Sequence, residues 1–430
     1  MAHSTVILDS RTASTRAILI VVVALALVFA WFAVRWQLGD MLGELTPANQ
    51  PNVREVADTA ISLAPRDPMP RWLAAAKEKE NFSPAGIENS VRMFETVVRL
   101  SPYDYRWWIE LGRAYEQAEQ ADRAESAFKH AVSLAPAYTF PHWQFGNFYL
   151  RQNRTEEAFA ELRKTTEKSV AYREQVFSLA WDYFDKDPQK LEMVAASGPD
   201  VRATLASFYA VRGRAEDALR VWDTLTDEQK APHEAIARSI AQGLHDRKFY
   251  RQALEFARQT GIDPNAQFET VTNGGFEEFI GPSEETLFSW RINRAEGRAD
   301  VMPDSTVKTE GARSLRITFK GYTKPELYNL IQFVAVQPAQ KYRLTFMLRT
   351  DNLKSGGPPL LKVTAGPENT VIAATGPFAT GSSDWKKVEL EFSIPENADG
   401  ISIITSRALC AGECPITGSV WYDDFQLTRL

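Results

Sequence analysis

The stretch that decides the fold of the N-terminal part is Tyr105–Tyr138, which reads YRWWIELGRAYEQAEQADRAESAFKHAVSLAPAY. Its apolar and small residues recur at the spacing of helix faces. The positions that set this pattern are Trp108, Leu111, Gly112, Tyr115, Ala124, Phe128, Ala131 and Pro136. Gly112 and Ala124 are small enough to let two helices approach closely, and Pro136 ends the second helix. The stretch therefore predicts a pair of packed helices.

The same spacing recurs along the chain, which indicates a repeat. The further positions in register are Phe145, Gly146, Tyr149, Ala158 and Leu162, then Leu205, Tyr209, Gly213, Ala218 and Trp222, with weaker copies upstream and around Tyr250. His142 stands where an aromatic residue is expected, and residues 168–200 are a degenerate copy. This pattern resembles the tetratricopeptide repeat. The resemblance implies a helical solenoid over about residues 47–262 that presents a groove to a protein partner, or serves as a curved spacer.

An apolar run precedes the repeats. Residues 17–34 read AILIVVVALALVFAWFAV without a charged residue, and as a helix they would measure roughly 27 Å, close to the hydrocarbon thickness of a bilayer. Trp31, Arg35 and Trp36 at its end suit the membrane interface. We expect a cytoplasmic tail at residues 1–16 and a single transmembrane helix at 17–36. A cleaved signal peptide is the alternative.

Few charges set the orientation of this helix. Arg11 and Arg16 precede it with Asp9 opposing them, and Asp40 and Glu44 follow it. The bias of basic residues toward the cytoplasmic side predicts a cytoplasmic N-terminus. We therefore expect a single-pass protein of the inner (cytoplasmic) membrane with the bulk of the chain outside the cytosol.

The C-terminal part has a different period. After Gly261 and Pro264 the helical spacing ends, and apolar and polar residues alternate in segments with turn residues between them. The clearest alternating segments are Ser314–Phe319, Tyr342–Arg349, Val388–Ile394 and Ser419–Leu427. Many short strands in one region predict an antiparallel two-sheet β-sandwich over residues 266–430. The fold class is thus multidomain, α then β.

The order of signals in this region resembles the jelly-roll carbohydrate-binding modules and their galactose-binding-like relatives. The segments that carry the resemblance are Asn273–Glu278 (NGGFEE), Trp290, Gly311–Ile317 (GARSLRI), Leu330–Val336 (LIQFVAV), Trp385 and Tyr422–Leu427 (YDDFQL). The resemblance implies a glycan ligand. The same sandwich also serves as a structural or protein-binding module in other proteins.

Sugar binding requires aromatic rings that stack on pyranose rings and planar polar groups that bond to hydroxyls. The candidates of these types are Tyr322, Tyr328, Gln332 and Arg349. Trp290, Trp385 and Trp421 fit the core equally well.

The resemblance also implies a structural calcium ion between the first and last strands, although no cofactor is required. Glu277 or Glu278 and Asp423 or Asp424 are the candidate ligands, since calcium prefers carboxylate oxygens. Salt bridges or solvation would explain them equally. The two cysteines, Cys410 and Cys414, lie close enough in sequence for a local disulfide, with two free thiols as the alternative.

Composition and motifs exclude several functions. A net charge of -6 lacks the basic surface that nucleic-acid binding needs. The sequence has no glycine-rich phosphate loop after a strand, no His-Glu-x-x-His and no Gly-x-Ser-x-Gly, so we expect no enzyme. A glycosidase that uses two facing carboxylates is the remaining enzymatic alternative.

Together these features predict a membrane-anchored, non-catalytic scaffold of the bacterial cell envelope. In this hypothesis the sandwich binds a polysaccharide during its assembly or attachment, and the repeats bind a protein partner. The alternative is a pure protein-interaction scaffold of a membrane complex, with a structural sandwich. The sequence does not identify the glycan or the partner.

Overall fold

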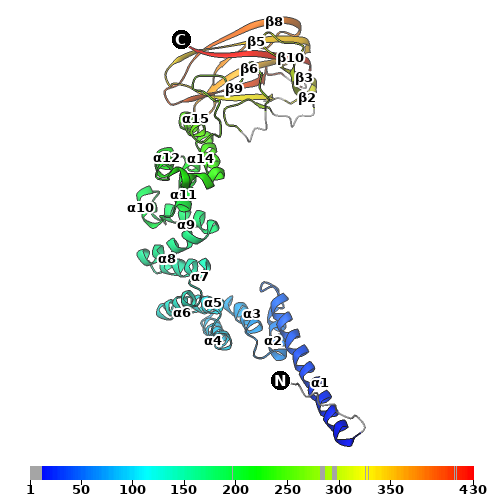
Figure 1. Cartoon of the computed structure of the whole chain (residues 1–430), viewed down its shortest axis with the longest axis vertical. Helices are drawn as coiled ribbons and strands as arrows, with labels where there is room; N and C mark the ends of the chain where they lie inside the picture. The colour runs from blue at the N-terminus through cyan, green and yellow to red at the C-terminus, as the bar shows by residue number, and fades with distance from the viewer. Residues whose placement is uncertain are drawn as a thin grey trace, which may run out of the picture. The chain divides into compact units, whose positions relative to one another are not determined.

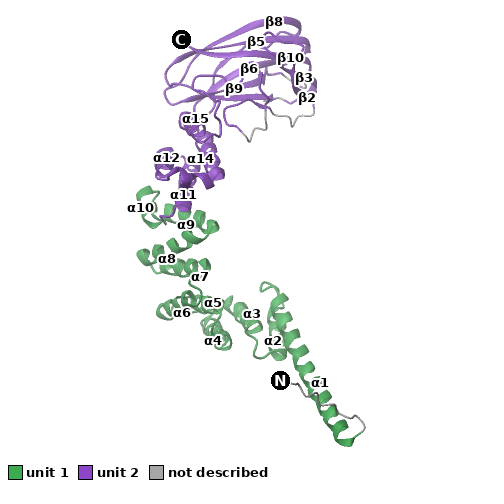
Figure 2. Ribbon diagram, viewed as in Figure 1, with its two compact units in different colours: residues 1–196 green, residues 197–430 purple. Residues whose placement is uncertain are grey.

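The structure is a computed structural model that describes residues 12–195, 197–280, 286–292, 298–324, 326–327, 329–410, 412 and 414–430. It consists of two compact units, residues 1–196 and 197–430 (Figure 2). The first unit is helical. The second contains further helices followed by two β-sheets (Figure 1). The predicted order of α then β is confirmed.

The first unit is a series of helices joined by short turns. They are α1 (Ala13–Leu45), α2 (Val53–Leu63), α3 (Pro68–Lys79), α4 (Pro84–Leu100), α5 (Tyr105–Gln117), α6 (Ala121–Leu134), α7 (Thr139–Arg151), α8 (Thr155–Lys168), α9 (Val170–Tyr183) and α10 (Pro188–Val194). Asp104 begins α5 by accepting a hydrogen bond from the backbone N–H of Arg106 at 3.0 Å. A Cβ at Gly112 would lie 3.0 Å from the Phe128 ring, so the predicted close approach of α5 and α6 requires glycine.

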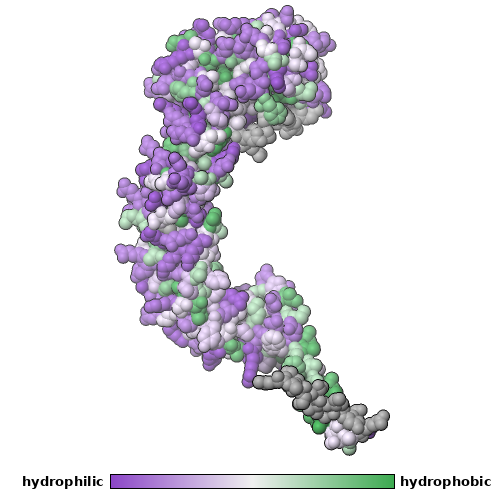
Figure 3. Space-filling model, in the orientation of Figure 1, coloured by the Kyte–Doolittle hydropathy of each residue, from purple (hydrophilic) through white to green (hydrophobic). Residues whose placement is uncertain are grey.

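The N-terminal helix α1 carries the apolar run. Its side chains there are exposed, for example Ile20 at 69% and Phe29 at 76%, and Figure 3 shows this helix in the hydrophobic colour. Among the described residues it is the one helix long and apolar enough to cross a membrane. It continues past the predicted membrane-spanning segment to Leu45, and in this part Gly39 lies against Ala64 and Gly43 against Pro70.

The second unit begins with helices that continue the repeats. They are α11 (Pro199–Val211), α12 (Ala215–Asp223), α13 (Asp227–Lys230), the 3-10 helix η1 (Ala231–His233), α14 (Glu234–Asp246) and α15 (Tyr250–Gln259). Gly243 of α14 lies against the backbone of α11, where a Cβ would meet the amide nitrogen of Val211 at 3.0 Å. Helix packing of the repeat type therefore extends to the start of the β-region.

The remaining residues form an antiparallel sandwich. Its strands are β1 (Arg291–Ile292), β2 (Ala299–Asp304), β3 (Ser314–Tyr322), β4 (Leu330–Ala335), β5 (Lys341–Lys354), β6 (Pro359–Ala365), β7 (Thr370–Ala374), β8 (Gly381–Ser393), β9 (Gly400–Arg407) and β10 (Ile416–Arg429). The first sheet has the order β1-β4-β9-β6-β7 and the second the order β2-β3-β10-β5-β8. One apolar core lies between them, with Tyr342, Phe346 and Tyr422 fully buried. The predicted sandwich is confirmed.

The sandwich packs on the last two helices of the same unit. Phe333 projects from the outer face of β4, where its ring centroid lies 4.6 Å from that of His245 and 5.7 Å from that of Tyr250. A Cβ at Gly400 would lie 2.3 Å from the Tyr250 ring, so only glycine admits this contact. The ammonium group of Lys248 donates to the carbonyl of Gly366 at 3.1 Å. Part of the first sheet is therefore covered by the chain's own helices.

Candidate functional site

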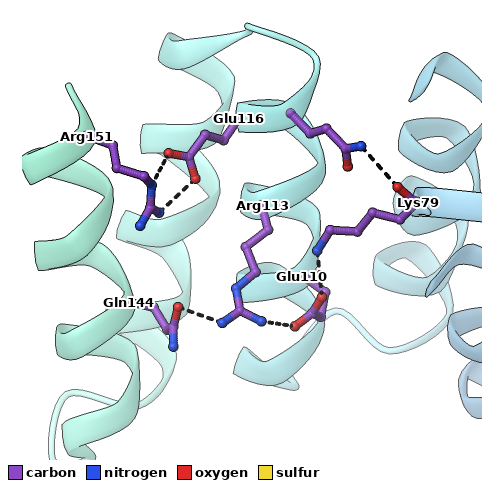
Figure 4. A network of polar contacts seen from close by, with 7 residues as sticks. Lys79, Glu110, Arg113, Glu116, Gln144 and Arg151 are labelled. Carbon is purple, nitrogen blue, oxygen red and sulfur yellow. Dashed lines mark hydrogen bonds and ion pairs between the residues drawn. The ribbon is translucent and has the colours of Figure 1, made fainter. Parts of the chain in front are cut away.

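A polar ladder joins α3, α5 and α7. Its members are Lys79, Glu110, Arg113, Glu116, Gln117, Gln144 and Arg151 (Figure 4). Arg113 donates to Glu110 at 2.7 Å and to Gln144 at 2.8 Å, so it links neighbouring repeats. Arg151 donates to both carboxylate oxygens of Glu116, at 2.5 and 2.8 Å. Three cations pair with the two carboxylates, Glu110 and Glu116, and a partner would meet a surface already cross-linked by hydrogen bonds.

The aromatic residues of the repeats divide between core and surface. Trp107 and Phe145 are buried at 8% and 5% exposure, whereas Tyr103 and Tyr138 are exposed at 87% and 61%. Exposed and half-buried aromatic residues lie at the starts of α5, α7 and α9. We call this set the aromatic ridge: Tyr103, Tyr138 and Phe140, which are exposed, and Tyr105, Trp143 and Tyr172, which are half-buried. The rings of Tyr105 and Tyr138 lie 5.6 Å apart, and those of Trp143 and Tyr172 lie 5.3 Å apart. The ridge is the candidate partner surface of the array.

The structure separates the predicted sugar-contacting residues. Tyr322 is 3% exposed, and its hydroxyl donates to the carbonyl of Glu326 at 2.6 Å. Gln332 is fully buried and donates from Nε2 to the carbonyl of Thr272 at 2.7 Å. Neither can contact a surface ligand in this conformation, which does not support the expected role of these two residues. Tyr328 lies outside the described residues.

Arg349 is the described candidate that lies on the surface, on the outer face of β5. Its side chain is 38% exposed and its guanidinium carbon lies 5.9 Å from the centroid of the Trp421 ring. Trp421 also lies on this outer face, since its neighbours Val420 and Tyr422 in β10 point into the core. By contrast Trp290 belongs to the core, packed on Phe425 with centroids 5.0 Å apart. In the sequence, the alternation of core and outward residues along β10 was the signal that could have placed Trp421 on the outer face.

The two predicted calcium ligands, Glu277 and Asp423, both lie beside Gly275. Glu277 accepts hydrogen bonds from the backbone N–H of Ala312 at 2.9 and 3.0 Å, and Asp423, at 1% exposure, accepts one from the N–H of Thr309 at 2.8 Å. A Cβ at Gly275 would lie 3.9 Å from Oδ1 of Asp423 and 3.9 Å from Oε1 of Glu277. Both carboxylates therefore border the space that this glycine leaves open.

This donor set is compatible with calcium only if further oxygens contribute. Within the described residues, no group of three or more His, Cys, Asp or Glu side chains is placed to hold a metal ion. Glu277 and Asp423 could supply two carboxylates, and backbone carbonyls or water would have to complete the shell. Asp424 is turned away by its positive φ of 51° and accepts a hydrogen bond from Gln426 at 2.7 Å.

A second group of loops meets at the far end of β9. Cys410 and Cys414 form a disulfide with Cα atoms 6.4 Å apart. Arg407, only 6% exposed, donates to the carbonyls of Lys324 and Cys414 and to the hydroxyl of Ser355. Burial among these neutral acceptors lowers the pKa of the Arg407 guanidinium. The buried guanidinium of Arg407 thus connects the three loops that contain Lys324, Ser355 and Cys414.

Two protein families match parts of the chain. Residues 269–406 match the family described as "Carbohydrate binding domain", and residues 105–138 match "Tetratricopeptide repeat". The chain therefore combines a tetratricopeptide repeat with a carbohydrate-binding-type sandwich, as the sequence predicted. Both matched families are of binding types, which is consistent with a non-enzymatic protein.

Individual relatives also match parts of the chain. Superkiller complex protein 3 from Homo sapiens is 23% identical over 201 residues, which span 46% of this chain and only 11% of that protein. A structure described as "CBM4 structure and function" shares 18% identity, with a TM-score of 0.28, over 37% of this chain and 99% of its own. MamA from Desulfovibrio magneticus RS-1 shares 25%, with a TM-score of 0.26, over 31% and 72% of the two chains.

Proposed function

We propose that the chain is a membrane-anchored, non-catalytic protein of the bacterial cell envelope whose sandwich binds a polysaccharide and whose repeats bind a protein partner. The observation that carries the proposal is the match of residues 269–406 to a carbohydrate-binding family in the same chain as a tetratricopeptide repeat. Polysaccharide assembly or attachment is the setting in which a membrane anchor, a glycan-binding domain and a partner-binding array are all used.

The contacts of α1 support a permanent anchor over a removed signal segment. Gly39 and Gly43 are buried against Ala64 and Pro70, and the guanidinium of Arg35 donates to the carbonyl of Ser62. The helix that carries the apolar run thus continues without a break into the packing of the array. The Cys410–Cys414 disulfide supports the orientation, since disulfides persist in oxidising compartments outside the cytosol.

We include a structural calcium ion in the proposal. Glu277 and Asp423 would hold it near Gly275 and so tie the segment before β1 to β10. The ion would supply a fixed positive charge between two carboxylates that otherwise repel each other. Its role would be to stabilise the fold, with no part in any reaction.

The test is binding of the full chain, in detergent micelles, to a panel of neutral and acidic polysaccharides by affinity electrophoresis. Retardation by at least one polymer, and not by a gel that lacks polysaccharide, is expected. A variant without binding but with an unchanged circular dichroism spectrum would map the site. Absence of retardation by every polymer would contradict the glycan-binding proposal.

The alternative scaffold function is favoured by a separate observation, the exposure of the aromatic ridge. Tyr138 at 61% exposure offers a large aromatic surface to a partner, as aromatic residues do at many protein interfaces. A photo-crosslinking amino acid at position 138 should capture one specific protein in cells, while the same group at exposed Met193 should not. Capture of a partner together with failure of every polysaccharide would favour this alternative.

A further inference from the structure

The outer face of the second sheet carries a row of side chains that cross four strands. The register pairs Met302 of β2 with Arg316 of β3, Arg316 with Trp421 of β10, and Trp421 with Arg349 of β5. Trp421 is therefore flanked by an arginine on each neighbouring strand. Adjacent strands lie about 4.8 Å apart, so the two arginine backbones are about 10 Å apart with the indole between them.

Asp304 holds this row in place from one side. It accepts a hydrogen bond from Nε1 of Trp421 at 3.0 Å and forms an ion pair with Arg316 at 3.3 Å. Burial opposes its ionisation, but the hydrogen bonds from Thr306, Trp421 and the N–H of Val307 prevail and hold its pKa well below the usual range. The indole and Arg316 are thus fixed by a permanent negative charge.

Arg349 is held much more loosely. It pairs with Asp384 at 3.7 Å, and the Asp384 side chain is 89% exposed. On the same strand and face, Arg343 donates twice to Glu391, at 3.1 and 2.6 Å. An exposed pair at 3.7 Å contributes little free energy, so an incoming anion can replace Asp384 at small cost.

We propose that this row, Arg316, Trp421 and Arg349, is a binding site for an acidic saccharide, one that carries uronate carboxylates or sulfate groups. The inference rests on the proposed function and assigns its ligand class and location. The guanidinium of Arg349 binds a ligand anion through two parallel N–H donors, a geometry that arginine favours. Trp421 is only 6% exposed in the structure, so a pyranose ring reaches its ring face only after Arg349 has turned from the indole to the anion.

Among the described residues of β4 in the first sheet, the aromatic residue and the amide that could contact a sugar are both engaged elsewhere. Phe333 on its outer face is engaged by His245 and Tyr250, and Gln332 points into the core. The second sheet instead carries two partly exposed guanidinium groups, those of Arg316 and Arg349, on either side of the mostly buried indole of Trp421. An aromatic ring between two cations selects a ligand with both a pyranose surface and negative charge.

The experiment compares polymers that differ only in charge. The full chain in detergent is titrated with polygalacturonate and with its methyl-esterified form, and then with alginate and dextran sulfate beside unsubstituted dextran. Binding of at least one acidic polymer at least tenfold tighter than its neutral counterpart is expected. Affinity should fall with added salt, because the anion contacts are screened.

Three variants locate the site. Arg349→Gln should weaken binding of the acidic polymer about tenfold, as expected for loss of a charge-assisted contact. Arg343→Gln on the same strand and face is the matched control and should leave binding unchanged. Asp384→Asn removes the competing carboxylate from an exposed position and should tighten binding two- to threefold, a gain that misfolding could not produce.

The outcomes distinguish this inference from the proposed function. If neutral polymers bind as well as acidic ones, or if Arg349→Gln binds like the wild type, the site is wrong while glycan binding by the sandwich stands. If no polymer of either kind binds, both fail. Tight acidic binding that depends on Arg349, but not on Arg343, supports both.

Discussion

Asp399, in the turn before β9, accepts hydrogen bonds from the backbone N–H of Tyr250 at 3.2 Å and of Arg251 at 3.0 Å. These are the first two residues of α15, and the residue that precedes this helix supplies no side-chain cap of its own. The N-terminus of the last repeat helix is therefore capped by a carboxylate from the sandwich, 149 residues further along the chain. Folding of the helix and folding of the sandwich are coupled at this point.

We predict that Asp399→Ala destabilises α15 by about 1–2 kcal/mol, the typical value for loss of an N-cap. Hydrogen exchange of the α15 amides in the full chain should become correspondingly faster. Asp399→Asn retains an acceptor for only one of the two N–H groups, which bond to different carboxylate oxygens, and should therefore recover part of the protection. Equal exchange rates in the wild type and the alanine variant would show that the cap contributes nothing.

A second prediction concerns the small positions of the repeat. A Cβ at Gly146 would lie 2.7 Å from Cγ of Leu162 and 3.1 Å from the carbonyl oxygen of Ala158. Gly146→Ala should therefore lower the free energy of unfolding by about 1–3 kcal/mol through overpacking. Gly376→Ala, where the added Cβ meets no atom within 4 Å, is the control and should change it little. Chemical denaturation followed by circular dichroism measures both.

These glycines illustrate what could be predicted from the sequence. Gly112 and Gly146 were predicted at helix contacts because the repeat spacing places a small residue where two helices cross, and a steric requirement of that kind is local. The cap formed by Asp399 was not predictable, because nothing near Tyr250 in the sequence points to a residue so far along the chain. Likewise the contacts of α1 at Gly39 and Gly43 were not predictable, because their partners Ala64 and Pro70 lie further along the chain.

The binding residues were harder to predict for a related reason. The alternation of residues along a strand indicates which of them share a face. A polar residue such as Gln332, however, is ordinarily expected on the surface even when its face is otherwise apolar. Gln332 shares its face with Leu330 and Val334 and is buried with them, and the Thr272 carbonyl accepts a hydrogen bond from its Nε2. Trp421 is the opposite case, because it is an apolar ring on the outer face of the sheet that is nevertheless mostly buried, at 6% exposure. Only the pairing of strands brings it between Arg316 and Arg349.

The calcium proposal gives a third prediction. Saturating calcium should stabilise the sandwich against thermal unfolding, by about 2.7 kcal/mol at a concentration one hundredfold above the dissociation constant. Glu277→Gln should abolish this calcium-dependent gain, whereas Glu278→Gln, at the neighbouring carboxylate, should preserve it. Because Glu277 also accepts the N–H bonds of Ala312, the readout is the difference with and without calcium in each variant. Identical unfolding with calcium and with chelator would count against the ion.

A fourth prediction concerns Arg407, which joins three loops at the end of the sandwich. Arg407→Lys keeps the positive charge but loses the planar fork that reaches several acceptors at once. Faster hydrogen exchange is expected for the backbone around Ser355 and Cys414, with no change in β5. Arg349→Lys is the control, because Arg349 lies on the surface and forms one ion pair, with Asp384. If the backbone amides around Ser355 and Cys414 exchange in the variant at the same rates as in the wild type, Arg407 does not hold these loops together.

The last prediction is a pH dependence at the contact between α14 and the sandwich. His245 is 3% exposed among the rings of Tyr250, Phe288 and Phe333, and burial, assisted by the charge of Arg291, lowers its pKa to about 4 despite the nearby carboxylate of Asp246. Its neutral form is favoured by folding, whereas the unfolded chain takes up a proton near pH 6.5. Stability is therefore lost as the pH falls from about 6.5 to about 4, by ~3 kcal/mol in total.

Two nearby carboxyl groups act in the opposite direction, so a variant is needed to isolate the histidine. Burial raises the pKa of Asp263 and of Asp399, although each accepts backbone hydrogen bonds that oppose the shift, and such groups favour the folded state as the pH falls. His245→Phe keeps an aromatic ring in the contact and should remove the loss between pH 6.5 and 4, while exposed His130→Gln should retain it. Hydrogen exchange of α14 and α15 at both pH values, corrected for the intrinsic rate, measures the difference. If the phenylalanine variant loses as much stability as the wild type over this range, the dependence has another origin.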